Sequence, residues 1–226
     1  MKLKLKKWAI VYNPTKTGTK AVATHLAKIL KAEGVKSEVM EGPVKSLKGY
    51  DIGASVGGDG TLLGLVEAAL AAKVPLVGVN MGKLGYLACV AKENLERDTK
   101  RILSGEFLPL ERCIIEATFP DGAKHHALND VVIKSADFRL AELKVRVDDE
   151  FVTEYSCDGL IFATATGSTA YNLSAGGPIL HQGAKGVVMT PICAHTLTNR
   201  SVLFDPASVL TVEGGQTNVH INIDGR

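Results

Sequence analysis

The chain has 226 residues, of which 46% are hydrophobic and 22% are charged, and its formal net charge is +2. This length allows one large domain or two small ones, and the composition is ordinary for a soluble globular protein. The small positive charge gives no argument for a nucleic-acid-binding protein, and no apolar run approaches the ~20 residues that span a bilayer.

The N-terminus and the cysteines are typical of a protein from a reducing compartment. The apolar run at residues 8–12 is stopped by Asn13-Pro14 and is far too short for the core of a secretory signal peptide. The cysteines are widely spread without metal-type spacing, so we expect reduced and mostly buried thiols. They are Cys89, Cys113, Cys157 and Cys193. We therefore expect a cytoplasmic protein that binds neither nucleic acid nor membrane.

Short apolar segments alternate with helical stripes in the first half of the chain. Residues 19–33 carry apolar side chains at helical spacing, and Gly34 ends this stripe. Strands are predicted at 8–12, 35–40, 52–56 and 75–79, and helices at 19–33, 61–72 and 92–103. Short buried strands separated by helices predict a parallel sheet with helices on its faces.

The pattern changes after about residue 105, where turn residues separate many short strands. Pro120-Asp121-Gly122 and Asp148-Asp149-Glu150 are hairpin signals. Strands are predicted at 112–119, 126–133, 143–147, 151–155, 159–164, 186–189, 201–204, 208–212 and 218–223. Such a series is typical of a β-sandwich. We therefore predict an α/β domain with a parallel sheet over residues 1–106 and an all-β sandwich domain over residues 107–226.

Residues 57–61 (Gly-Gly-Asp-Gly-Thr) lie between a predicted strand and a predicted helix. Glycines let phosphate oxygens approach backbone N–H groups, and a helix N-terminus adds unpaired donors and partial positive charge. A carboxylate inside such a cradle is explained if Asp59 binds Mg²⁺ or accepts a proton from an attacking hydroxyl. The alternative is that Asp59 or Thr61 only caps the helix, although capping does not explain Gly57 and Gly58.

Residues 158–178 are dense in small and hydroxyl-bearing side chains and follow an apolar stretch. Such side chains offer donors and acceptors close to the backbone, which suits the base and ribose of a nucleotide. Tyr171 has a ring that can pack on a base. The alternative is a turn-rich crossover in which Ser and Thr serve as caps.

These segments together resemble the NAD kinase family. Residues 57–61, 128–132 (Leu-Asn-Asp-Val-Val) and 158–178 occur in the family's order and rough spacing, and residues 78–87 and 190–197 resemble two further stretches. The resemblance covers nearly the whole chain. The Gly-Gly-Asp-Gly-Thr turn is shared with lipid kinases and, in related form, with phosphofructokinases, whereas the match at 158–178 is much more specific.

The resemblance implies a reaction and a set of site residues. The reaction is phosphoryl transfer from ATP, another triphosphate or polyphosphate to the 2′-hydroxyl of the adenosine ribose of NAD. A divalent metal such as Mg²⁺ would come with the nucleotide, since the protein alone fixes no metal site. The implied catalytic acid/base is Asp59, and the implied phosphate loop is Gly57, Gly58, Gly60 and Thr61. The implied NAD ligands are Asp59, Gly60, Asn129, Asp130, Asp158, Thr169, Ala170, Tyr171 and Ser174.

The resemblance also implies assembly into homodimers or homotetramers, with Asp158 presented across a subunit interface. Two weaker candidates remain. Arg139 either faces a phosphate or is a solvated arginine, and His195 either helps form the site or is structural.

Three positions depart from the family pattern. Asp130 stands where many members have Glu, Ala165 stands where Pro is usual, and the sequence stops at Arg226 while members continue. The β domain is therefore expected to be either compact or incomplete at its C-terminus. Two competing functions stay open: a lipid or sugar kinase that uses the same turn, and a dinucleotide-binding module that has lost catalysis.

Overall fold

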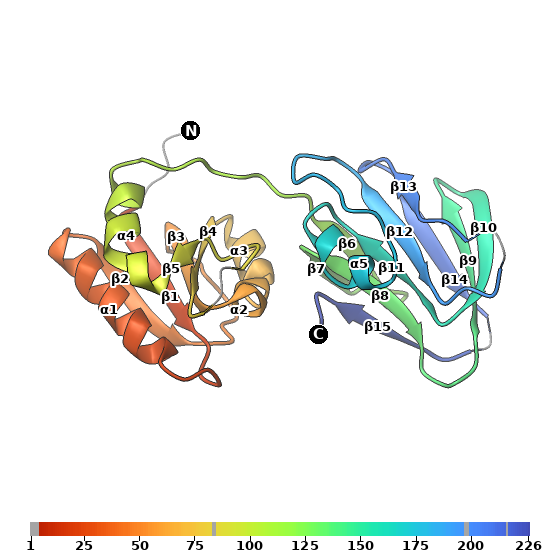
Figure 1. Cartoon of the computed structure of the whole chain (residues 1–226), viewed down its shortest axis with the longest axis horizontal. Coiled ribbons are helices and arrows are strands. Elements are labelled where there is room, and N and C mark those ends of the chain that lie inside the picture. Colours follow the sequence, from red (N-terminus) through yellow and green to blue (C-terminus); the bar gives the residue numbers. More distant parts are fainter. Residues whose placement is uncertain (1–4, 83–84, 197–198, 216) are drawn as a thin grey trace. The chain divides into compact units, whose positions relative to one another are not determined.

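The computed structural model describes residues 5–82, 85–196, 199–215 and 217–226. The chain divides into two compact units, Met1–Pro109 and Leu110–Arg226. Figure 1 labels the elements of each unit. Each unit has its own sheet and its own apolar core.

The N-terminal unit is built on a five-stranded sheet in the order β2-β1-β3-β4-β5, in which every pairing is parallel. The strands are β1 (Lys7–Tyr12), β2 (Lys36–Glu41), β3 (Ile52–Gly57), β4 (Leu76–Asn80) and β5 (Val90–Ala91). The helices are α1 (Thr19–Ala32), α2 (Asp59–Leu63), α3 (Val66–Ala72) and α4 (Leu95–Leu103), with a 3₁₀ turn, η1 (Lys92–Asn94), before α4. The predicted parallel α/β fold is confirmed.

Successive side chains of β1 point to opposite faces of this sheet, as the pleat requires. Trp8 and Ile10 pack in one core with apolar side chains of α1 and with Leu95 of α4. Ala9 and Val11 pack in a second core with side chains from the α3 region. A strand that is buried on both faces reads as a continuous apolar run, which is why residues 8–12 were recognisable in the sequence.

The single helix predicted at 61–72 is wrong, because two short helices occupy this segment. The break falls at Gly64 and Leu65, where the Leu65 N–H donates to Leu62 O (2.9 Å) in a tighter turn. Glycine is a poor helix former, so the helix is weakest at this point. The break also buries Leu65 in the second core, where it is 1% exposed.

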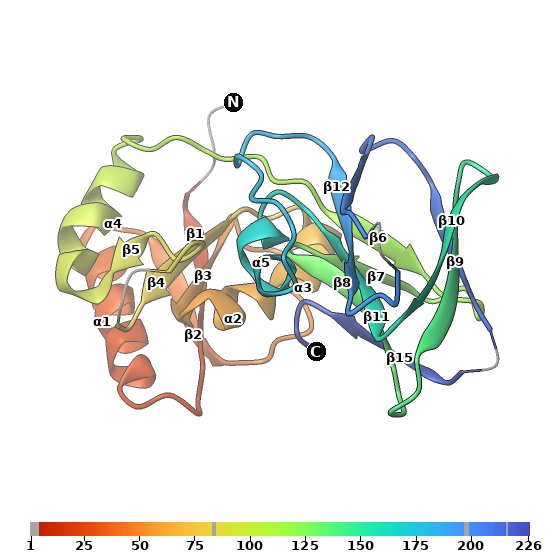
Figure 2. The same cartoon turned by 45° about the vertical axis from the view of Figure 1, so that its right-hand side comes forward.

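The C-terminal unit is a β-sandwich, as predicted, and Figure 2 shows its two main sheets. The five-stranded sheet has the order β13-β12-β11-β8-β15, and the three-stranded sheet has the order β10-β9-β14. The first contains β8 (Asp130–Ser135), β11 (Gly159–Ala163), β12 (Val187–Ile192), β13 (Val202–Phe204) and β15 (Val219–Ile223). The second contains β9 (Ala141–Val147), β10 (Glu150–Cys157) and β14 (Leu210–Gly214). Leu143 of one sheet and Leu160 and Phe162 of the other share one core.

The single strand predicted at 126–133 is also wrong. The structure has β6 (Ile115–Thr118) paired with β7 (Lys124–Ala127) in a small hairpin, and β8 starts separately at Asp130 in the five-stranded sheet. The chain turns at Leu128 and Asn129, between these two strands. The contacts that hold this turn come from residues remote in sequence, so local periodicity could not show it.

The four cysteines are unpaired, but the expectation that most are buried is wrong. Cys157 is buried, Cys113 is half-buried, and Cys89 and Cys193 are exposed. Burial raises the pKa of the Cys157 thiol to about 11. Within the described ranges, the helices include none that is long and apolar enough to cross a membrane.

We expect Leu30→Ala to lower the free energy of unfolding by about 2–5 kcal/mol, since it removes a fully buried side chain from the core under α1. Trp8 is the chain's only tryptophan and is buried in the same core, so its fluorescence during urea unfolding reports on this unit. Leu108→Ala is the matched control, because Leu108 is 89% exposed. Equal midpoints for the two variants would contradict the packing described.

Candidate functional site

The strand order of the N-terminal unit fixes where a ligand can approach the sheet. The chain passes from β1 outward to β2 and then returns to β3 on the other side of β1, so the order reverses between β1 and β3. In open α/β sheets, ligands bind at such a switch point, outside the carboxyl ends of the strands. The segment after β1 is tied to β3 there, because the Asn13 N–H donates to Val56 O (3.1 Å).

A pocket of about 500 Å³ lies at this edge. It is lined by Lys16, Thr17, Gly57, Gly58, Asp59, Asn80, Met81 and Gly82. Lys16 is exposed and forms no ion pair with a described residue. A Cβ built on Gly58 would lie 3.2 Å from Lys16 Nζ, so the ammonium group lies directly against the glycine turn. The pocket therefore combines a cation with a backbone that carries no side chain, which suits an anion.

The segment that carries Lys16 is held in place by its own polar groups. Thr19 Oγ1 donates to Asn13 O (2.6 Å) and lies 2.8 Å from Lys16 O. Thr15 donates to Asn13 Oδ1 through its N–H (2.9 Å) and through its hydroxyl (2.8 Å). Sequence reasoning missed Lys16, because its proximity to Gly58 depends on the strand order. The available signal was a lysine in the loop after a buried first strand.

Asp59 is the first residue of α2, and its carboxylate accepts hydrogen bonds from three consecutive backbone N–H groups. The donors are Tyr86 to Oδ2 (2.8 Å), Leu87 to Oδ1 (3.1 Å) and Ala88 to Oδ1 (3.0 Å). A Cβ on Gly85 would lie 2.2 Å from Asp59 Oδ1, so the absence of a side chain at Gly85 lets the carboxylate approach. Asp59 thus fixes the segment that leads into β5.

The capping alternative for Asp59 is not supported. The residue at the N-cap of α2 is Gly58, and no side chain caps this helix. An ionised carboxylate has about four acceptor positions, two on each oxygen. The three amides take two positions on Oδ1 and one on Oδ2, so one position on Oδ2 has no donor among the described residues and can accept from a hydroxyl.

The glycine before the turn is required by Thr61. A Cβ on Gly57 would lie 2.2 Å from Thr61 Oγ1. That hydroxyl is buried and has no hydrogen-bond partner among the described residues. Gly60, in contrast, is exposed, and a Cβ there would meet nothing within 4 Å. The predicted phosphate loop is therefore assembled as one turn, with Gly60 on its open side.

The second group of predicted residues gathers in the C-terminal unit, around the turn between β7 and β8. The Asp224 carboxylate accepts from the backbone N–H groups of Leu128 (2.9 Å), Asn129 (2.7 Å) and Asp130 (3.2 Å). The carbonyl of Asn129 accepts from the Thr164 N–H (2.9 Å), and the carbonyl of Leu128 accepts from the Thr164 hydroxyl (2.6 Å). Sequence reasoning did not single out Asp224.

Asp130 is buried, at 5% exposure, and no described residue donates a hydrogen bond to its carboxylate. Burial and, secondarily, the nearby charge of Asp224 raise the pKa of Asp130 to about 6. Asn129 is half-buried, and its side-chain amide has no partner among the described residues. Neither group is among the sealed polar atoms without a partner, so both stay accessible to a ligand, and a perturbed carboxyl of this kind is typical of a ligand site.

The segment after β11 separates into residues that hold it and residues that face outward. Asn172 is fully buried; its amide donates to Ser168 O and Pro178 O (both 3.0 Å). Its Oδ1 accepts from the Thr190 hydroxyl (2.7 Å). The predicted ligands in this segment are half-buried or exposed: Thr169, Ala170, Tyr171 and Ser174. A Cβ on Gly167 would lie 2.0 Å from Asn129 O, so this segment packs directly against the Asn129 turn.

Three further predicted site residues lie at the end of β11 remote from Asp130, namely Asp158, Arg139 and His195. Ala163 pairs with Asp130 and Gly159 pairs with Lys134, so Asp158 stands beyond the far end of this pairing. Five residues of extended strand separate Ala163 from Asp158 by roughly 16 Å. The His195 N–H donates to Ser156 O (2.8 Å), and Arg139 O accepts from the Ser135 hydroxyl (2.7 Å) at that same end. Within one subunit, Asp158, Arg139 and His195 are therefore not brought together with Asp130.

Parts of two matched stretches lie outside the described residues, namely 83–84 of residues 78–87 and 197 of residues 190–197. Within the described ranges, no group of three or more His, Cys, Asp or Glu side chains could hold a metal ion.

Two family models match the chain. The ATP-NAD kinase N-terminal domain matches residues 45–107, and the ATP-NAD kinase C-terminal domain matches residues 128–226. The first match includes the turn that carries Asp59, and the second includes Asp130 and Asp224.

Individual proteins agree with the family models. An NAD kinase of Caldicellulosiruptor bescii is 37% identical over 218 residues, covering 96% of this chain and 83% of that protein. One from Caldicellulosiruptor saccharolyticus is 36% identical, covering 92% and 80%.

Solved structures share the fold. A structure of an Archaeoglobus fulgidus NAD kinase in complex with ATP has a TM-score of 0.82 at 27% identity, covering 97% of this chain and 84% of that one. A structure of yeast NADH kinase complexed with NADH has a TM-score of 0.86 at 24% identity, covering 98% and 75%. The chain therefore belongs to the NAD kinase family, the enzymes that transfer a phosphoryl group to NAD.

Proposed function

We propose that the chain transfers the terminal phosphoryl group of ATP to the 2′-hydroxyl of the adenosine ribose of NAD, with Asp59 as the acceptor of the hydroxyl proton. The observation that carries this proposal is the Asp59 carboxylate, which three backbone amides orient while one acceptor position on Oδ2 stays open. A carboxylate fixed in this way binds or deprotonates a hydroxyl without having to reorganise.

The donor phosphates are proposed to bind in the pocket beside Asp59. Lys16 supplies a positive charge, and the Gly57–Gly58 backbone allows close approach of phosphate oxygens. ATP is the favoured donor because the similar Archaeoglobus fulgidus enzyme was crystallised in complex with ATP. The remaining donor candidates are another triphosphate and polyphosphate.

A divalent metal is proposed to enter with the nucleotide. Both Asp59 oxygens already accept amide N–H groups, and no acidic cluster of the described chain is suited to hold a metal alone. The donor phosphates, with Asp59 and Thr61 beside them, fit a Mg²⁺ ion that neutralises phosphate charge during transfer. The protein's own part is to position the two substrates and to accept the proton.

NAD is proposed to be bound by the turn between β7 and β8 and by the half-buried or exposed residues of the segment after β11. Asn129 and the buried Asp130 offer a side-chain amide and a carboxylate to which no described residue is bonded, and these groups match ribose hydroxyls. Thr169, Ala170, Tyr171 and Ser174 offer hydroxyl groups and one ring beside them. In this proposal the unit 1–106 of the sequence prediction carries phosphoryl transfer and the unit 107–226 binds NAD.

The two competing functions have less support. A lipid or sugar kinase shares only the glycine turn, whereas both matched family models are of ATP-NAD kinases. The same family models weigh against a binding module without catalysis, since both are named for ATP-NAD kinases. Formation of NADP from NAD, ATP and Mg²⁺ is the direct test, with a lipid and a sugar phosphate as alternative acceptors.

We expect Asp59→Asn to lower the turnover number by about 10²–10⁴, the usual contribution of an acid–base group. The Asn side chain keeps one acceptor oxygen, but its NH₂ group opposes the amides of residues 86–88, so the melting temperature falls as well. NADP formation, NAD affinity by calorimetry and a thermal melt measure the three effects. A rate within about threefold of the parent would remove Asp59 from the chemistry.

Gly85→Ala is the matched control for Asp59→Asn, because it disturbs the same contact and keeps the carboxylate. The new Cβ would lie 2.2 Å from Asp59 Oδ1 and must displace either the loop or the side chain. We expect a smaller loss of rate than for Asp59→Asn at a similar loss of stability. An equal loss of rate would show that loop position, rather than proton acceptance, explains the effect.

We expect Asp130→Asn to weaken NAD binding and to stabilise the fold at neutral pH. A carboxyl whose pKa rises from 3.8 to about 6 on folding makes the folded state less stable as pH rises from about 4 to about 6. At pH 7 the penalty is fully present; screening by solvent reduces it to about 1–3 kcal/mol, and the neutral Asn side chain removes it. The melting temperatures of the parent and of Asp130→Asn should therefore be similar at pH 4.5, and the variant should melt at a higher temperature at pH 7.5.

The binding half of this prediction is measured by calorimetry with NAD and with ATP. Loss of one charged hydrogen bond corresponds to about 1.5–3 kcal/mol of NAD affinity, with ATP affinity unchanged. Unchanged NAD affinity would exclude Asp130 from the site, whatever the melts show.

We also propose that the chain assembles into a homodimer or homotetramer. The support is the position of Asp158, which lies too far along β11 to join Asp130 in one subunit, so that it serves the site of another. We expect light scattering at micromolar protein to give a mass above one chain. A fully active monomer would refute this proposal.

A further inference from the structure

The turn between β7 and β8 has no local reason to hold its shape. It joins β7, which pairs with β6, to β8, which pairs with β11 in another sheet, so the two strands that it connects do not form a hairpin. Isolated backbone N–H groups that lie inside a protein must find acceptors. Here the N–H groups of residues 128–130 all donate to one carboxylate, that of Asp224, which lies more than 90 residues away in the sequence.

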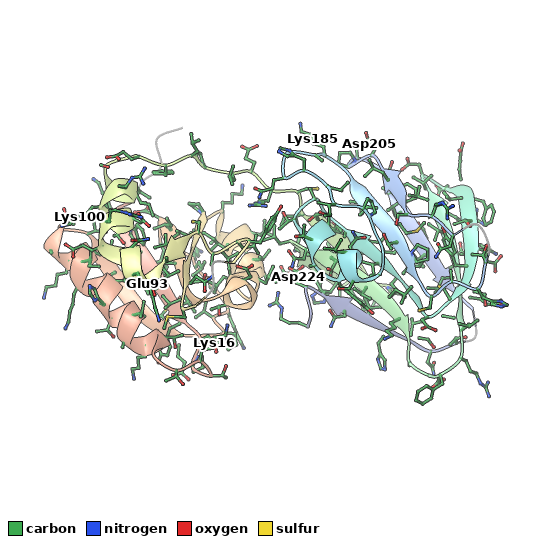
Figure 3. The ribbon with its side chains drawn as sticks, viewed as in Figure 1. Lys16, Glu93, Lys100, Lys185, Asp205 and Asp224 are labelled. Atoms are coloured by element: carbon green, nitrogen blue, oxygen red, sulfur yellow. The ribbon has the colours of Figure 1, made fainter. Side chains whose placement is uncertain are left out.

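Asp224 is itself fixed from both sides. It follows the last residue of β15, whose Ile223 pairs with Val131 of β8. Its own backbone N–H donates to Asp130 O (3.0 Å), so the two residues are joined by bonds in both directions. The side chain is 7% exposed, and Figure 3 labels it near the end of the chain. Because Asp224 is buried, water cannot take the place of its carboxylate as acceptor for all three N–H groups unless the turn rearranges.

The backbone of the turn is fully occupied, while its side chains are not. The carbonyl groups of Leu128, Asn129 and Asp130 each accept a hydrogen bond, and their N–H groups all donate to Asp224. The Asn129 amide and the Asp130 carboxylate have no partner among the described residues. The turn is therefore built to present two polar side chains and to keep its backbone out of ligand binding.

We propose that Asp224 is a positioning residue for NAD, which acts by holding the Asn129–Asp130 turn in the conformation that receives the dinucleotide. This inference rests on the proposed role of Asn129 and Asp130 in binding NAD. Asp224 does not touch the reacting atoms in this proposal, because three of the about four acceptor positions of its carboxylate are taken by the amides of residues 128–130 and it acts through them.

The charge of Asp224 gives the role a signature in the pH dependence. Ala163 of β11 pairs with Asp130 and is uncharged, and the C-terminal segment contributes the charge of Asp224. In the segment after β11, the Thr164 hydroxyl donates to Leu128 O and the Thr166 hydroxyl accepts from Arg112. Burial is the larger cause of the raised pKa of Asp130, and the Asp224 charge adds to it. Removing that charge must lower the pKa of Asp130.

The experiment compares Asp224→Asn with the parent and with Asp205→Asn. Asp205 is exposed, belongs to the same unit and accepts one local N–H, that of Ala207 (2.8 Å); Figure 3 shows it well away from Asp224. For Asp224→Asn we expect the KM for NAD to rise about tenfold or more, with the KM for ATP and the turnover number within about threefold. The Asp205 variant should match the parent in all three constants.

The pH profile tests whether the Asp224 charge acts on Asp130, while the split between the KM for NAD and the KM for ATP separates positioning from simple destabilisation. In the parent, the KM for NAD should rise as pH falls below about 6, where Asp130 becomes protonated. In Asp224→Asn this rise should begin at lower pH, because the charge that opposes ionisation of Asp130 is gone. An unshifted inflection together with an unchanged KM for NAD would overturn the proposal.

A second variant and a second measurement keep the proposal testable if Asp224→Asn does not fold. Asp224→Glu keeps the charge but moves the carboxylate by one methylene, so it should raise the KM for NAD and leave the inflection where it is. Amide exchange of the peptide around residues 128–130 should be slow in the parent and faster in this variant. An unchanged KM for NAD in Asp224→Glu, with unchanged exchange, would overturn the inference.

These outcomes are distinct from failure of the proposed function. If Asp130→Asn leaves NAD affinity unchanged, the proposed NAD site itself is wrong. If Asp130→Asn weakens NAD binding while both Asp224 variants behave as the parent, only the positioning role is wrong.

Discussion

A carboxylate that accepts three consecutive backbone N–H groups is the interaction on which both candidate sites depend. Asp59 binds the amides of residues 86–88 in the parallel-sheet unit, and Asp224 binds those of residues 128–130 in the sandwich. A charged acceptor makes each of these hydrogen bonds stronger than a neutral one, and three donors use most of its capacity. Each carboxylate therefore holds in place a loop that has little regular secondary structure of its own.

The two carboxylates differ in what remains available to a ligand. Asp59 lies at a pocket on the carboxyl edge of the sheet and keeps an open acceptor position there, so it both organises a loop and can act on a substrate. Asp224 is buried, and its bonds leave Asn129 and Asp130 as the polar groups without partners. In the function proposed above, the same interaction supports a chemical role in one unit and a positioning role in the other.

This distinction also explains how much the sequence could predict. Elements set by local pattern were recognisable: the apolar run of β1, the stripe of α1 and the hairpin of β9 and β10 all lie where periodicity and turn residues predict. The break at Leu128–Asn129 was not, because the acceptor for its amides is Asp224, 94 to 96 residues away. Lys16 was missed for a similar reason, since only the strand order brings the segment after β1 against Gly58.

Asp130 is a candidate site residue because its ionised carboxyl lowers the free energy of unfolding. Its carboxyl is buried near Asp224 and accepts from no described residue, and both burial and the neighbouring charge disfavour its ionised form. A position selected only for stability would carry an uncharged side chain there, because a neutral group avoids both penalties. A ribose that donates its hydroxyls to this carboxylate would supply the missing donors and offset the penalty on binding. In the proposed NAD site, the instability of the free turn and the affinity for NAD would be two consequences of this one carboxylate.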